Sequence, residues 1–127
     1  MKTQTSLQAV LICIIVALLN GCATAPHSGP QALTGTWTNS PGTVWTIKAD
    51  GTFSVDLNKD GKPDAWGKYT VAGDTVTILE ASGKVPKACK KPATYHFTRK
   101  ADTLHFTLVK DACKLRIKNV LLDWKKK

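Results

Sequence analysis

The chain has 127 residues, of which 43% are hydrophobic and 21% charged, and its formal net charge at pH 7 is +9. This length allows one small domain behind a leader and excludes two. The sequence contains no metal-hydrolase, P-loop, dinucleotide-binding or nucleophile-elbow pattern. We therefore expect a binding protein rather than an enzyme, and no obligatory cofactor.

The N-terminus predicts export and lipidation. Lys2 is followed by an unbroken apolar run over residues 9–19, which has the length of a signal peptide and is too short to cross a bilayer comfortably. Residues 19–22, Leu-Asn-Gly-Cys, resemble a bacterial lipobox, which predicts a lipoprotein signal peptide over 1–21 and acylation of Cys22, palmitate included. An ordinary secretory signal and a membrane-anchoring helix are the alternatives. Ala23 resembles the signal for outer-membrane retention, so we expect a lipid anchor facing the periplasm.

Lysines supply most of the positive charge, in clusters such as Lys87, Lys90 and Lys91 and the terminal run 125–127. An exported, lipid-anchored chain is not expected to bind nucleic acid. An anionic envelope surface would attract such lysines, although a solvated basic face that keeps a small protein soluble is the simpler interpretation. We expect a monomer that reaches the membrane through its anchor.

Residues 22–32 combine small residues with Pro and Gly and show no apolar periodicity, which predicts a lipidated N-terminus and a flexible linker. The domain is expected at 33–127, where short alternating runs are separated by turn residues and no helical period occurs. Without helical crossovers, neighbouring strands must be antiparallel. The expected strands lie near 35–40, 43–48, 52–57, 65–72, 74–80, 94–99, 103–109 and 115–124.

Three hairpins can be placed by asking which loop keeps the apolar residues on one face. Between the second and third strands, a three-residue loop that ends in a left-handed Gly51 satisfies this condition. Two-residue loops at 72–73 and 100–101 satisfy it for the later hairpins. The expected pairs are Ile47 with Phe53, Trp45 with Val55, Tyr69 with Val76, Phe97 with Leu104, and Tyr95 with Phe106.

The last of these registers also places His96 directly opposite His105 on the outer face. Two imidazoles in such a pair could hold a transition metal. A functional site usually needs a third ligand, and neither strand offers one at the right position. Two exposed histidines are the simpler interpretation.

The cysteines predict one disulfide. Cys13 leaves with the signal peptide and Cys22 is modified, so Cys89 and Cys113 remain as a pair that an oxidising compartment would bridge. The expected register brings Cys89 to the level of residue 112. Closing a loop of about 25 residues would add on the order of 3 kcal/mol to the stability.

Two sets of residues resemble known proteins. A Gly-x-Trp that ends at Trp37, together with Arg116 in the last expected strand, resembles the calycin superfamily, the lipocalins in particular. The rest of the domain is similar to a family of small lipocalin-like bacterial envelope proteins without an assigned activity. The matching residues, in order, are Gly67-Lys68-Tyr69, Cys89, Tyr95-His96-Phe97, Asp102-Thr103-Leu104, Asp111-Ala112-Cys113-Lys114-Leu115-Arg116 and Trp124.

The resemblance implies an all-β, eight-stranded antiparallel up-and-down barrel, in which Trp37 stacks under Arg116 at the closed end. A shallow barrel could be filled by its side chains or could keep an apolar pocket, and both remain open. The first hypothesis is therefore a binder of a small apolar or amphiphilic molecule. The alternative is a filled-barrel interaction module, such as an inhibitor or an accessory of an envelope complex. The pocket candidates are Trp45, Phe53, Tyr69, Tyr95, Phe97 and Phe106.

The loop over residues 56–64 resembles a calcium loop. Oxygen-bearing residues recur at positions 1, 3, 5 and 9, and Gly61 at position 6 permits a sharp bend. The same residue types are common in any long hairpin connection, so calcium is one of two interpretations. The candidate ligands are Asp56, Asn58, Asp60, the backbone carbonyl of Lys62, and Asp64.

Overall fold

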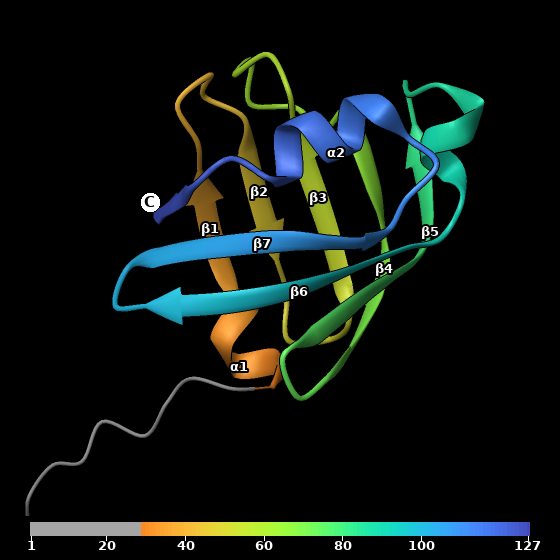
Figure 1. The fold of residues 1–127 in the computed structure, drawn as a ribbon. Helices are drawn as coiled ribbons and strands as arrows, with labels where there is room; N and C mark the ends of the chain where they lie inside the picture. Colours follow the sequence, from red (N-terminus) through yellow and green to blue (C-terminus); the bar gives the residue numbers. More distant parts are fainter. Residues whose placement is uncertain (1–28) are drawn as a thin grey trace, which may run out of the picture.

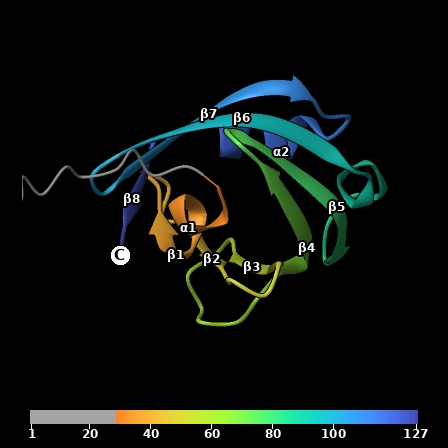
Figure 2. The ribbon, with the colours of Figure 1, turned by 90° about the horizontal axis from the view of Figure 1, so that it is seen from below.

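The computed structural model describes residues 29–127. Within these residues, eight strands follow one another around a closed antiparallel barrel, and β8 pairs with β1 (Figures 1 and 2). The expected eight-stranded antiparallel barrel is confirmed. The strands are β1 Gly35–Thr38, β2 Val44–Ile47, β3 Thr52–Asp56, β4 Ala65–Ala72, β5 Thr75–Gly83, β6 Ala93–Lys100, β7 Thr103–Lys110 and β8 Trp124–Lys126. The expected signal peptide and Cys22 lie outside the described residues.

Helices lie at the two ends of the barrel. Helix α1, Pro30–Leu33, lies at the end where β1 begins, and α2, Lys114–Val120, lies across the opposite end (Figure 1). Helix α1 is held by a hydrogen bond from the N–H of Gly29 to the carbonyl of Gly73, 3.1 Å long, in the β4–β5 turn. A 3-10 turn, η1 Lys87–Lys90, precedes β6.

Two predictions about the secondary structure were wrong. Residues 114–120 form helix α2 instead of a strand, and the closing strand β8 is confined to Trp124–Lys126. Cys113 caps the helix, because its Sγ accepts from the N–H of Arg116, and the first helical residues are good helix formers. The expected linker also ends earlier than residue 32, because residues 30–33 form α1 and bury Ala32 and Leu33 in the core.

The β2–β3 register is confirmed, with Ile47 opposite Phe53, and Gly51 has a φ of 86°. The two later registers were wrong. The loops are residues 73–74 and 101–102, one position later than expected, so every partner changes by two residues. The observed pairs are Tyr69 with Ile78, Val71 with Val76, Phe97 with Phe106, Arg99 with Leu104, and Tyr95 with Leu108.

The shift of these two loops does not change which residues face inward, because side chains alternate with a period of two along a strand. Gly73, with a φ of 61°, and Ala101, with a φ of 49°, supply the left-handed conformation that a tight hairpin turn requires. All six aromatic residues expected inside the barrel are buried. They form a connected cluster in which Trp45 contacts Phe106, with ring centroids 5.4 Å apart.

Candidate functional site

A cavity of about 200 Å³ lies at the α2 end of the barrel. Its inner wall consists of buried residues of the barrel core, and its outer border consists of exposed or half-buried residues. Almost all of these side chains are apolar, so the cavity favours an apolar group over water. The inner residues are Trp45, Phe53, Ala65, Ile78, Val120 and Trp124, and Leu57 and Leu115 are among the border residues.

Helix α2 covers the cavity without filling it. Val120 is the buried residue of this helix, whereas Leu115 is 64% exposed at its other end. The helix is held in place by Asn119, whose Oδ1 accepts from Asn39 Nδ2 at 2.8 Å and from Thr43 Oγ1 at 3.2 Å. These bonds connect α2 to the β1–β2 turn and keep it across the open end of the barrel.

The expected pocket residues divide into two groups. Trp45 and Phe53 line the cavity. Tyr69, Tyr95, Phe97 and Phe106 do not line it and instead fill the barrel interior, so the prediction that they form a pocket was wrong. Alternation along a strand shows that a side chain faces inward but not how deep it lies along the barrel axis. Sequence reasoning also missed Ala81, Leu115, Val120 and Trp124.

One polar atom in the cavity wall has no partner. The Nε1 of Trp45 is the buried side-chain nitrogen without a hydrogen-bond acceptor among residues 29–127. The indole of Trp45 contacts the ring of Trp124, with centroids 5.2 Å apart, and the ring of Phe106. An unpaired buried donor costs about 1–3 kcal/mol, which the aromatic contacts of the same ring help to offset.

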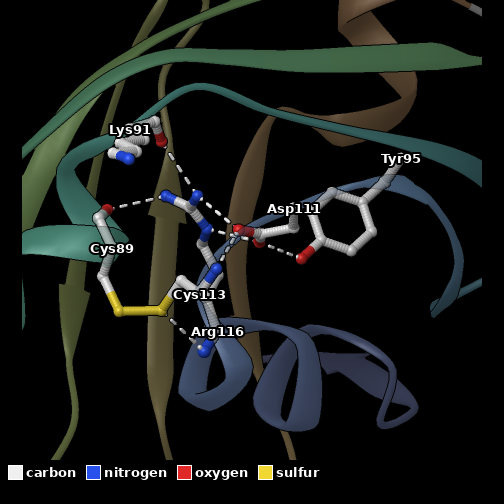
Figure 3. Close-up of a disulfide and its surroundings, with 6 residues drawn as sticks. All are labelled: Cys89, Lys91, Tyr95, Asp111, Cys113 and Arg116. Carbon is white, nitrogen blue, oxygen red and sulfur yellow. Dashed lines mark hydrogen bonds and ion pairs between the residues drawn. A yellow bond between two sulfur atoms is a disulfide. The ribbon is translucent and has the colours of Figure 1, made fainter.

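Arg116 lines the cavity and forms an ion pair with Asp111 next to the disulfide (Figure 3). The guanidinium of Arg116 donates to both oxygens of Asp111, from Nε at 2.6 Å and from Nη2 at 2.7 Å. The same guanidinium donates to the backbone carbonyls of Cys89, at 2.8 Å, and of Lys91, at 2.9 Å. Arg116 therefore joins α2 to the segment that precedes β6.

The carboxylate of Asp111 is fully buried and satisfied. It accepts from the hydroxyl of Tyr95 and, at 2.8 Å, from the N–H of Cys113, in addition to Arg116. Burial alone would raise the pKa of Asp111, but the hydrogen bonds from Arg116, Tyr95 and Cys113 outweigh it and lower this pKa. Burial, followed by the hydrogen bond to Asp111, raises the pKa of Tyr95. The carboxylate therefore stays ionised and the phenol neutral.

The expected cysteine pair is confirmed. Cys89 and Cys113 form a disulfide whose Cα atoms are 4.6 Å apart. The disulfide joins η1, just before β6, to the first turn of α2, just after β7, and both cysteines line the cavity. It therefore closes the open end of the β6–β7 hairpin, as the sequence predicts.

The expected stack of Trp37 on Arg116 was wrong. Arg99 of β6 lies over the Trp37 ring, with its Cζ 5.1 Å from the ring centroid, and it also donates to the carbonyl of Ala32 at 3.1 Å. Arg116 cannot reach Trp37, because it belongs to α2 and is bound to Asp111 at the opposite end of the barrel. The expected cation–π contact exists, but an arginine from a different strand makes it.

In the loop over residues 56–64, where calcium binding was expected, the side chains accept hydrogen bonds from the loop's own backbone. Asp56 accepts from the N–H of Gly61 at 2.9 Å, and this bond bends the loop. Further bonds run from the N–H groups of Asn58 to Asp56, Asp60 to Asn58, Lys62 to Asp60, and Leu57 to Asp64. In residues 29–127, no three His, Cys, Asp or Glu side chains are grouped so that they could hold a metal ion. Turn chemistry accounts for the loop, and calcium stays a prediction.

The expected placement of the two histidines was wrong. His96 lies opposite Thr107, and His105 lies opposite Thr98, because the β6–β7 turn begins one residue later than expected. His96 Nδ1 is 3.0 Å from Thr75 Oγ1, and His105 Nδ1 is 2.8 Å from Asp123. The two imidazoles therefore have separate neighbours and do not form a shared metal site.

Comparison with models of protein families, with curated proteins and with solved structures finds no match to this chain. Between residues 29 and 127, neither helix has the length and apolar character needed to cross a membrane.

Proposed function

We propose that this chain is an envelope protein that binds a small apolar or amphiphilic molecule in the cavity at the α2 end of its barrel. The cavity itself is the observation that carries the proposal, because it is lined by Trp45, Phe53, Ile78 and Trp124 and reaches the surface beside Leu115. A preformed apolar cavity with few polar groups is the usual form of a small-molecule site. The ordered motifs that resemble lipocalin-like envelope proteins support the same proposal.

A titration with 1-octanol, followed by tryptophan fluorescence, tests this function, because Trp45 and Trp124 line the cavity. Ala81 lines the cavity and is partly buried, so Ala81→Leu should occupy the space and abolish a saturable response. Ala72→Leu is the matched control, because Ala72 is exposed at the opposite end of β4. No saturable response in the unmodified protein, or an equal response in Ala81→Leu, would disprove the proposal.

We propose in addition that the protein carries a lipid anchor at Cys22. Testing this requires the full chain with its N-terminal leader. The support is the lipobox-like run over residues 19–22 behind an apolar segment of signal-peptide length. Mass spectrometry of the mature N-terminus should find an acylated cysteine, with palmitate among its acyl groups, and Cys22→Ser should leave the leader uncleaved. A free amine on a later residue would show an ordinary secretory signal instead.

A second candidate is an interaction module that binds another envelope protein. The observation in its favour is the packed interior of the barrel, where Tyr95, Phe97 and Phe106 are buried in one cluster. Trp66 is also 49% exposed on the outer face of β4, and aromatic residues are frequent in protein interfaces. This candidate predicts that 1-octanol does not bind, so the titration above separates the two functions.

We also propose a binding role rather than an enzymatic one. His96 is the imidazole with a hydroxyl neighbour in residues 29–127, but Thr75 and Asp74 both approach the same nitrogen, Nδ1. A nucleophile and an orienting carboxylate need opposite nitrogens of the ring. This arrangement therefore does not support acyl transfer.

A further inference from the structure

The cations that line the cavity differ in what they already bind. Lys84 and Arg116 both contribute to the lining. Arg116 is compensated by Asp111 through two hydrogen bonds and by the carbonyls of Cys89 and Lys91 through two more. Lys84, in contrast, takes part in none of the ion pairs of residues 29–127. Lys84 is therefore the cation available to a ligand.

The chain around Lys84 is basic. No acidic residue occurs between Ala81 and Ala101, and this segment includes Lys87, Lys90 and Lys91. Helix α2, which covers the cavity, adds Lys114 and Lys118 without an acidic residue. These charges raise the local potential and favour an anion near the cavity.

The acidic loop over residues 56–64 forms no ion pair with Lys84. Asp64 is the carboxylate brought nearest by the backbone, since its carbonyl accepts from the N–H of Lys84 at 2.8 Å. Its side chain instead accepts from the N–H of Leu57 at 2.8 Å. The ammonium group of Lys84 therefore remains free of the loop.

The size of the cavity limits the apolar part of the ligand. An apolar cavity of about 150 Å³ is large enough to bind benzene, and this one measures about 200 Å³. A single ring or a short alkyl chain therefore fits inside it. Leu57 and Leu115, both exposed at the border, would cover the part of the ligand next to its head group.

We propose that the cavity binds a small organic acid, with its ring or short alkyl chain inside and its anionic group beside Lys84. This inference rests on the proposed function, because it assumes that the cavity is a ligand site. It goes further in giving the charge and the size of the ligand.

Three eight-carbon probes test the inference at neutral pH: octanoate, 1-octanol and octylammonium. The unmodified protein should bind octanoate more tightly than octylammonium. Lys84→Gln should lower the ratio of octanoate to 1-octanol affinity by up to about fivefold, the upper end of what an exposed ion pair supplies. Lys100→Gln, at the opposite end of β6, is the control and should leave this ratio unchanged. Raising the salt concentration should lower the octanoate preference of the unmodified protein.

The outcomes separate the two proposals. If 1-octanol does not bind at all, the proposed function is wrong and the inference fails with it. If 1-octanol binds but octanoate and octylammonium bind equally, the function stands and the inference is wrong. An octanoate preference that does not respond to salt would also contradict it, and this measurement does not depend on the folding of Lys84→Gln.

Discussion

The two ends of the barrel are built alike, but a cavity lies at the α2 end. At each end a short helix is followed by a strand whose tryptophan donates to a carbonyl of that helix. Trp37 Nε1 donates to Leu33 at 2.8 Å, and Trp124 Nε1 donates to Val120 at 3.0 Å. At the α1 end the result is a filled core, whereas the α2 end keeps a cavity of about 200 Å³.

The difference comes from what covers each tryptophan. At the α1 end, Leu33 is buried in the core and the guanidinium of Arg99 lies over the Trp37 ring. Side chains are therefore in direct contact with this tryptophan. At the α2 end, the helix is held from its sides, by the Arg116–Asp111 pair and by the disulfide, rather than by side chains that fill the barrel. Polar and covalent attachment can hold an element over an empty space, whereas apolar packing cannot do so without filling it.

The largest expected effect is at the α2 end. Asp111→Ala should lower the free energy of unfolding by about 3–5 kcal/mol, because it leaves the guanidinium of Arg116 without its partner in a mostly buried site. Urea unfolding measures this change. Asp123→Ala is the control, since Asp123 pairs with His105 at the surface and its loss should cost less than about 1 kcal/mol. Equal effects of the two variants would show that the attachment of α2 does not depend on Asp111.

The disulfide should have the next largest effect. Replacing both Cys89 and Cys113 by Ala should lower the stability by about 2–4 kcal/mol, because the unfolded chain loses the closed loop that the disulfide imposes. The same variant should weaken 1-octanol binding, since α2 then has one attachment fewer. Two free thiols in the native, unreduced protein would contradict the assignment.

At the α1 end, Arg99→Ala should cost about 1–2 kcal/mol through the lost stacking on Trp37 and the lost bond to Ala32. Arg99→Lys should recover part of this, because a lysine keeps the charge but not the planar group. Neither variant should change 1-octanol affinity, since the cavity is at the other end. A weaker affinity would show that the two ends are coupled.

Acid should lower the stability of the protein mainly through Asp111, at the α2 end. The pKa of Asp111 is lowered in the folded protein, so the unfolded chain takes up its proton first as the pH falls. The stability that Asp111 contributes is therefore complete above about pH 4 and is lost as the pH falls through the lower, folded pKa. Asp111→Asn should flatten this part of the curve of stability against pH. An unchanged slope would mean that other carboxyl groups cause the acid sensitivity.

The smallest expected effect concerns the loop over residues 56–64. Its side-chain oxygens already accept from backbone N–H groups, so millimolar calcium should change the melting temperature by less than about one degree relative to chelator. A shift of several degrees that Asp60→Ala abolishes would instead establish calcium binding. Asp56→Ala should destabilise the loop without calcium, because it removes the bond that bends the chain at Gly61.

The sequence by itself determined the antiparallel strands, the inward-facing aromatic residues and the cysteine pair, and these follow from local rules. The closed barrel was expected from the resemblance to lipocalin-like proteins. Alternation with a period of two decides the face of a residue such as Phe106. Each of the two misplaced turns kept its two-residue length and moved by one position, so partners changed by two residues and that face was unchanged. Cys89 and Cys113 could be paired because the other two cysteines, Cys13 and Cys22, lie in the predicted leader and the lipobox-like run.

Only the tertiary structure decided which arginine covers Trp37 and where the cavity lies. The helix at 114–120 depends on contacts between segments far apart in the chain, namely the disulfide and the carbonyls of Cys89 and Lys91, which bind Arg116. Those contacts take Arg116 to the α2 end and leave Trp37 to Arg99. Strand alternation specifies the side of the sheet but not the height along the barrel, and it is the height that separates the residues filling the core from those lining the cavity.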